Sequence, residues 1–220
     1  MRTGTINNYV KFDKNFGGVR KCYEGKPEIA VGGFSCDISL MPTNGNAMAA
    51  GTPVCYDEVA RTIVPLYTFK VLAVNTAEKT VKVEKFETGS VAKVGMKLLV
   101  VGDDLTQAVT NIATVTAIDS DAADYDILTV DAVTADSAAF IAEGDVLAEA
   151  KSDEVKKVKV IPNGLTYCDN VLDNEAYAID IDPVYFCIRP VLERRMPPLT
   201  ASLKKALRDN GCYFNFSPRK

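Results

Sequence analysis

Apolar and polar residues alternate along two stretches in the middle third of the chain, and the two stretches resemble each other. The first runs from Val71 to Val100 and the second from Val115 to Glu149. Each begins with an alternating segment, turns through polar residues and returns on a second alternating segment. Each closes with a glycine three residues before a leucine, namely Gly95 before Leu98 and Gly144 before Leu147. Alternation of period two predicts half-buried strands, so we predict a small β-barrel or sandwich built from a quasi-repeat.

Short apolar runs, interrupted by glycine, proline and asparagine, are typical of the flanking residues 1–66 and 151–220. Glu28–Ser39 is interpreted as a strand with a glycine bend. Further strands are predicted at Lys156–Ile161, Ala176–Ile181 and Val184–Val191.

One helix is predicted at Ala201–Asn210, because Leu203, Ala206 and Leu207 share a face. Thr200 is the expected N-cap, and Gly211 can adopt the left-handed conformation that ends a helix.

The predicted fold class is therefore mainly β. Residues 1–66 plus 151–220 would form a β-rich base domain with one C-terminal helix. Residues 67–150 would form an inserted domain, which requires its two ends to lie close together. A single continuous up-and-down β domain is the alternative.

Composition adds to this picture mainly by arguing against catalytic and metal-binding sites that use histidine or paired cysteines. The chain has 220 residues, of which 47% are hydrophobic and 25% charged, and it contains no histidine. The commonest general base and the commonest transition-metal ligand are thus missing. The six cysteines show no CxxC spacing, so a zinc site is not indicated and we expect reduced thiols. We expect a protein that is not an enzyme and has no cofactor.

Charge is distributed unevenly around a net value of −4. Residues 69–150 contain 6 Lys and Arg against 14 Asp and Glu, whereas the flanks contain 19 against 15. An acidic insert repels phosphates, so a nucleic-acid partner is not expected. No apolar run reaches the length of about 20 residues that a membrane helix needs, and no export signal is recognised at the N-terminus.

Clustered carboxylates offer two candidate sites. Asp119, Asp121, Asp124 and Asp126 lie within eight residues, as in a calcium-binding loop, but the central glycine and closing glutamate of an EF-hand are missing. A solvated hairpin loop is the competing interpretation, and ion binding stays open. Asp180 and Asp182 would share one strand face, where they could serve acid–base chemistry or simply face water.

Two cysteines and an arginine pair are further candidate sites. Cys187 and Cys212 lie in apolar segments, which indicates core packing rather than nucleophilic thiolates. Arg194 and Arg195 precede Met196–Pro198 in a segment predicted to be extended, since a residue before proline avoids helical geometry. Because arginine is favoured at interfaces, this pair is the candidate partner-binding site.

Several short motifs resemble the head-decoration and head-fibre proteins of tailed bacteriophages. Ala50–Val54 (AGTPV) is followed by Tyr56–Glu58, Arg61 and Pro65–Leu66, similar to a G-[TS]-P-V/L … D … P-L stretch of that class. The second half of the repeat, within Ile118–Leu147, is similar to strands of the same class. The resemblance covers about two thirds of the chain.

This resemblance implies a structural virion protein on the capsid exterior, with the major capsid protein as partner. It also implies a homotrimer that is assembled in the host cytoplasm. The alternative is a glycan- or receptor-binding module, for which the Tyr213, Phe214 and Phe216 segment is the candidate surface. A small carboxylate-only enzyme using Asp180 ranks third, because no second carboxylate is indicated.

Overall fold

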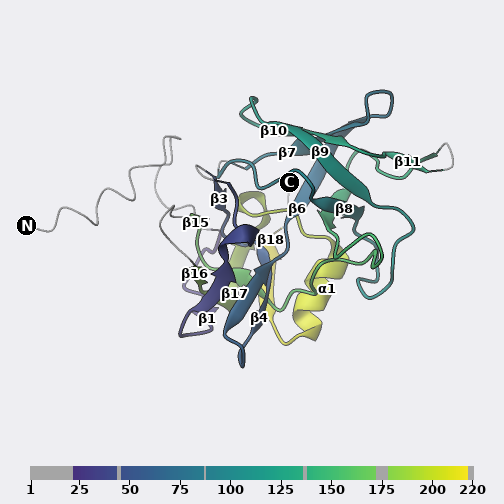
Figure 1. Cartoon of the computed structure of the whole chain (residues 1–220). Coiled ribbons are helices and arrows are strands. Elements are labelled where there is room, and N and C mark those ends of the chain that lie inside the picture. Colours follow the sequence, from purple (N-terminus) through teal and green to yellow (C-terminus); the bar gives the residue numbers. More distant parts are fainter. Residues whose placement is uncertain (1–21, 44–45, 87, 136–137, 172–177, 218–220) are drawn as a thin grey trace, which may run out of the picture.

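The computed structural model describes residues 22–43, 46–86, 88–135, 138–171 and 178–217. It is mainly β, with 45% of residues in strands and 8% in helices, and it contains a closed six-stranded barrel. This confirms the predicted fold class. Figure 1 shows the barrel at the upper right, above a larger sheet from the flanking parts of the chain.

The barrel strands run in the order β10-β7-β6-β13-β8-β9, and every neighbouring pair is antiparallel. Buried residues alternate with more exposed ones along the strands, as in β7 and β10, so every second side chain fills the interior. The strands are β6 (Thr68–Asn75), β7 (Thr80–Glu84), β8 (Lys97–Val100), β9 (Ala113–Asp119), β10 (Tyr125–Val130) and β13 (Val146–Glu149).

The two halves of the barrel are related by an internal pseudo-two-fold symmetry that matches the quasi-repeat. The backbone N–H of Gly95 donates to the carbonyl of Val115 (2.8 Å), and the N–H of Gly144 donates to the carbonyl of Val71 (3.0 Å). Val71 and Val115 donate back to Asp145 and Met96, the residues after the two glycines, both at 2.9 Å. Each half therefore binds the first strand of the other half through the same set of bonds.

A strand irregularity repeats in the same way. The register shifts between Val71 and Ala73 in β6, and the β9–β10 pairing shifts at the equivalent place, opposite Thr129 and Val130. A bulge of this kind bends a strand, which is what closing a sheet of six short strands requires. The quasi-repeat thus extends to the details of barrel closure.

The larger sheet is formed outside residues 68–149. Its order is β1-β17-β14-β4-β5-β2-β16, with β18 added in parallel to β17. Apart from that pair and the parallel contact of β2 with β5, its neighbours are antiparallel. The strands are β1 (Glu28–Ile29), β2 (Phe34–Asp37), β4 (Pro53–Asp57), β5 (Thr62–Pro65), β14 (Gly164–Thr166), β16 (Ala178–Ile181), β17 (Pro183–Leu192) and β18 (Tyr213–Ser217).

Two small sheets complete the strands: β3 (Ala47–Met48) pairs with β15 (Asn170–Val171), and β11 (Thr134–Ala135) pairs with β12 (Ala138–Ala139). The predicted glycine bend lies between β1 and β2, where Gly32 and Gly33 have φ values of 111° and 64°. Such values suit glycine, which has no Cβ to clash.

Helix α1 (Ala201–Asp209) confirms the helix prediction. The Thr200 hydroxyl accepts the N–H of Leu203 at 3.2 Å, which satisfies one of the donors left open at a helix start. Gly211, with φ 84°, follows the helix end. Leu203 and Leu207 form the buried face.

The predicted strand at Lys156–Ile161 is wrong. Only Val158 makes a β-bridge, to Ala150. The remaining backbone bonds are scattered over different partners, such as Lys159 N–H to Glu149 and Val109 N–H to Lys156 (both 2.8 Å). The apolar residues of this segment are used to cover a core cluster beside α1 rather than to extend a sheet.

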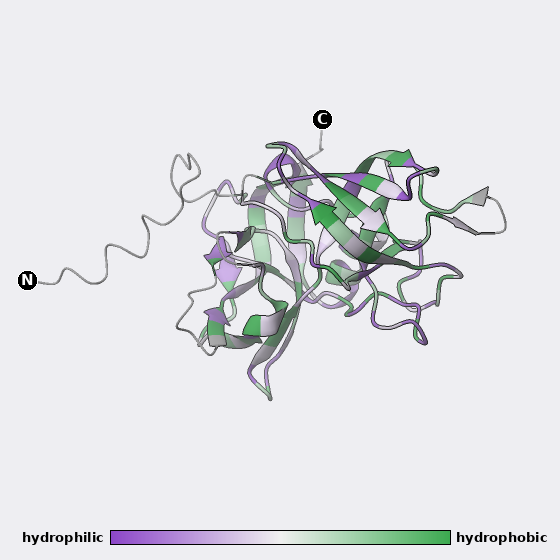
Figure 2. Cartoon of the chain, turned by 45° about the horizontal axis from the view of Figure 1, so that its top comes forward, coloured by the Kyte–Doolittle hydropathy of each residue, from purple (hydrophilic) through white to green (hydrophobic). Residues whose placement is uncertain are grey.

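The barrel and the larger sheet share hydrophobic cores. One cluster contains Phe34 and Met48 together with Val71, Val81 and Leu98 of the barrel. Figure 2 shows hydrophobic stretches on the strands of both parts. All six barrel strands lie within the predicted insert, whereas the division into two domains stays a prediction.

Candidate partner-binding surface

Arg194 and Arg195 lie at the end of β17, in the short 3-10 helix η3 (Glu193–Arg195). The prediction of an extended segment is therefore wrong for the two arginines. The restriction that proline imposes reaches only the residue directly before it, and Met196 is indeed extended (φ −142°, ψ 160°). Both arginine side chains are exposed.

The segment on which the arginines lie is anchored on both sides. Met196 is 1% exposed, and Pro197 and Pro198 are buried. Glu193 forms an ion pair with Lys204 of α1. Because the anchors flank the pair directly, the backbone that carries the two arginines is held in place on the surface.

A groove of about 160 Å³ lies beside this segment. Lys70, Gly144 and Val146 line it from the barrel. Glu193 and the residues 196–199 line it from the other side, and the two arginines lie between them in the chain without lining it. The candidate partner-binding site thus lies where the barrel meets the rest of the molecule, next to a surface depression.

The basic charge of the flanks is not spread over this surface. In residues 22–68 and 151–217, leaving out 172–177, twelve Lys and Arg face twelve Asp and Glu. The positive excess resides in residues 1–21 and 218–220, which contain seven Lys and Arg and one Asp. Within the described surface, Arg194 and Arg195 are therefore a local basic feature on a balanced background.

The acidic loop is a hairpin connection between β9 and β10, as one of the two interpretations predicted. The Asp119 carboxylate accepts the N–H of Asp121 at 3.1 Å, a local turn interaction. Asp126 is a buried residue of β10 and pairs with Lys85, whose Nζ also binds the loop carbonyls of Ser120 and Ala122. Among the described residues, no group of three or more metal-ligating side chains converges here or elsewhere.

Asp180 is an exposed residue of β16, and Asp182 follows the end of that strand. Cys187 is 1% exposed and Cys212 is 5% exposed. Burial raises the pKa of both thiols, that of Cys212 to about 11, so both stay protonated near neutral pH. All six cysteines are unpaired.

The aromatic segment lies on β18. The Tyr213 ring is 56% exposed and lies 5.5 Å from the ring of Phe186. Phe214 and Phe216 are half-buried against the core beneath β17. Of the three aromatic residues considered for glycan binding, Tyr213 alone presents most of its ring to solvent.

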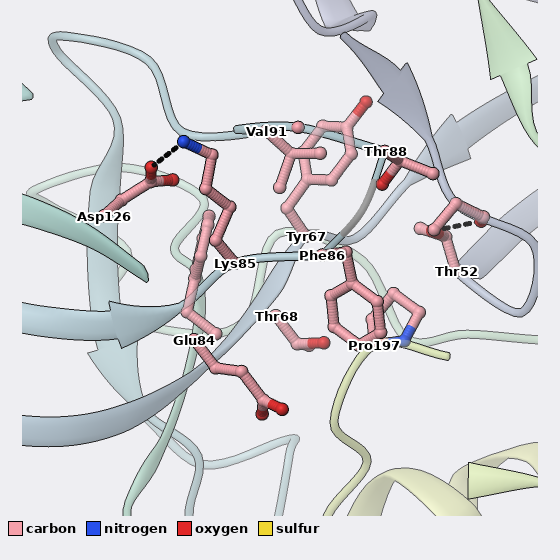
Figure 3. A pocket seen from close by; sticks show the side chains of 13 residues that line it. Thr52, Tyr67, Thr68, Glu84, Lys85, Phe86, Thr88, Val91, Asp126 and Pro197 are labelled. Carbon is pink, nitrogen blue, oxygen red and sulfur yellow. Dashed lines mark hydrogen bonds and ion pairs between the residues drawn. The ribbon is translucent and has the colours of Figure 1, made fainter. Parts of the chain in front are cut away.

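Sequence reasoning missed a buried polar centre at one end of the barrel (Figure 3). Lys85 Nζ lies 3.3 Å from Asp126 Oδ1, and the two side chains are 6% and 3% exposed. A cavity of about 20 Å³ borders the pair and is lined by Thr68 and Thr88. The hydroxyl groups of these two threonines are buried, and no hydrogen-bond partner is found for them. The signal was available, since Asp126 is two residues before Leu128 and so points inward.

Comparison with known proteins returned no match: no protein-family model, no curated protein and no solved structure matches the chain. Within the part of the chain that the structure describes, no helix has the length and apolar character needed to cross a membrane.

Proposed function

We propose that the chain is a non-enzymatic structural protein of a virion that binds the capsid exterior, as a decoration, cementing or head-fibre-base component. The observation that carries this proposal is the fixed display of Arg194 and Arg195 beside a groove. Paired guanidinium groups on a rigid support suit carboxylates of a partner protein, with which they form bidentate contacts. The phage-like motifs of the sequence agree with the major capsid protein as that partner.

The remaining features agree with this role. The acidic barrel, with 14 Asp and Glu against 6 Lys in residues 69–150, would face away from an acidic shell, because like charges repel. A closed barrel also removes exposed strand edges, which suits a protein crowded at high local concentration on a shell.

The test is charge reversal of the arginine pair. Arg194→Glu combined with Arg195→Glu should abolish co-sedimentation with assembled shells of the virus that encodes the chain. The thermal midpoint should change little, because exposed charges contribute roughly 0–1 kcal/mol to stability.

The matched control is Lys26→Glu with Lys151→Glu, two exposed lysines that belong neither to η3 nor to the groove lining. This variant carries the same change in net charge and should still bind. Equal loss of binding in both variants would indicate unspecific charge attraction, and undiminished binding of the arginine variant would remove the site.

A glycan- or receptor-binding module is the second candidate, favoured by the exposed ring of Tyr213. Aromatic faces stack on apolar ligand faces, and a solvent-exposed tyrosine is available for this. If the wild-type chain did not co-sediment with shells but bound ligands on a glycan array, this second function would be favoured.

A further inference from the structure

The buried pair of Lys85 and Asp126 joins the two repeat units of the barrel. Lys85 directly follows β7 of the first unit, and Asp126 belongs to β10 of the second. The two strands are neighbours, with Asp126 opposite Val83 in the register. A buried ion pair costs desolvation of both charges, which the attraction between them only partly offsets.

The hydrogen bonds of the lysine leave one direction open toward the aspartate. Nζ donates to the carbonyl oxygens of Ser120 (2.6 Å) and Ala122 (2.9 Å). Asp126 Oδ1, at 3.3 Å, has no hydrogen-bond partner, although it is fully buried. An ammonium has three donors, whereas a neutral amine has two donors and a lone pair. The two carbonyl bonds hold Nζ in place, and its remaining bonding direction faces the Asp126 carboxyl group.

The surroundings favour a neutral product over the charged pair. Phe69 and Phe86 line the same cavity, whose volume of about 20 Å³ is enough for one water molecule. Buried surroundings destabilise separate charges. Nζ lies 3.3 Å from Oδ1, which is bonded to Cγ, the atom that the amine would attack.

We propose that Lys85 and Asp126 condense to an intramolecular isopeptide bond. A proton first passes from the Lys85 ammonium to the Asp126 carboxylate, and the lone pair that this frees on Nζ attacks Cγ, so that a C–N bond forms. The C–O bond to the carboxyl hydroxyl then breaks, and the hydroxyl leaves with a proton from Nζ as water. Starting from the ammonium and the carboxylate, the balance is one amide and one water, with no oxidant or cofactor.

The bond would cross-link the first repeat unit covalently to the second, at the point where β7 and β10 are neighbours. This modification is independent of what the surface binds, so it goes beyond the proposed function. Glu84 lines the same cavity, but its side chain points away from the pair (Figure 3). The reaction therefore lacks an obvious proton relay among the residues drawn there, and we expect it to proceed slowly as the folded protein ages.

Mass spectrometry of the full chain, aged for several weeks in the folded state and then denatured, tests the proposal. Lys85→Arg and Lys93→Arg variants have the same sequence mass. Lys93 is a suitable control, because its Nζ binds the Ser39 carbonyl (2.5 Å) and is half-buried. The Lys85→Arg chain should be heavier by about 18 Da, the mass of the water that the control loses.

A tryptic digest of the wild-type chain gives an answer even if Lys85→Arg fails to fold. A cross-linked Lys85 resists cleavage, so Val83–Lys93 should appear joined to Leu98–Lys151. The proposal would be overturned if the aged Lys85→Arg and Lys93→Arg chains had equal mass. It would also be overturned if trypsin cut the wild-type chain after Lys85 and released the two peptides separately.

Discussion

At the scale of the residue, burial sets the chemistry of the cysteines. Cys22, Cys36 and Cys212 are at most 5% exposed, and desolvation raises their pKa values to about 12, 11 and 11. A thiolate is the reactive form of cysteine, so these side chains act as small apolar residues near neutral pH.

The raised pKa values predict a loss of stability in alkali. An unfolded cysteine titrates near its ordinary pKa of 9.0, below the pKa in the folded state. The stabilising contribution is therefore complete below about pH 9 and is lost as the pH rises toward 11 to 12. We expect the free energy of unfolding to fall by roughly 1 kcal/mol per thiol and pH unit in this window.

Denaturant unfolding at pH 8, 9 and 10 measures this slope. Cys36→Ala serves as the comparison, because it removes one of the thiols whose pKa burial raises and should flatten the slope whatever its effect on overall stability. Parallel slopes for the two proteins would contradict the assignment.

At the scale of the element, the two glycine turns before β8 and β13 are equivalent. Gly95 and Gly144 have φ values of 87° and 90°, and a Cβ added at either would meet nothing within 4 Å. Glycine is therefore required at both positions for backbone conformation alone, because residues with a Cβ atom are strained at positive φ.

Gly95→Ala and Gly144→Ala should each lower the free energy of unfolding by about 1–2 kcal/mol. Gly102→Ala is the matched control: its site is also open, and its φ lies outside the left-handed region. It should change stability by less than either turn variant, and chemical denaturation measures all three. If Gly144→Ala left the free energy of unfolding unchanged, the turn would have to adopt another backbone conformation without cost, which would contradict the prediction.

Period-two alternation was enough to predict the barrel strands, because one face of each strand is buried. The same logic failed at Lys156–Ile161, where valines alternate with lysines but cover a core without strand partners. The restriction before proline predicted an extended segment at Arg194 and Arg195 and missed their 3-10 turn. The Lys85–Asp126 pair was missed because its partners are 41 positions apart, and local pattern does not specify long-range pairing.

At the scale of the whole molecule, the distribution of charge bears on how many copies of the chain would bind a shell together. The barrel is acidic, and the described remainder is balanced. A shell with three-fold positions would accept a trimer that places three copies of the Arg194–Arg195 segment on it. Several weak contacts made at once bind far more tightly than one.

The phage resemblance implies a trimer, for which size-exclusion chromatography with light scattering should give a mass near three times 23.8 kDa. Reducing buffer is needed, because all six thiols are unpaired and oxidation between chains would imitate assembly. A mass of 23.8 kDa at every concentration would contradict the trimer in solution.

The exchange of bonds between the two halves of the barrel has an evolutionary consequence. Gly95 bonds to the first strand of the second unit, and Gly144 bonds to the first strand of the first unit. Each unit therefore carries both sides of one self-complementary interface, as the subunits of a two-fold dimer do. A half-length ancestor could have closed the same barrel by pairing two identical chains, and tandem duplication of its gene would then have turned that dimer into a single chain.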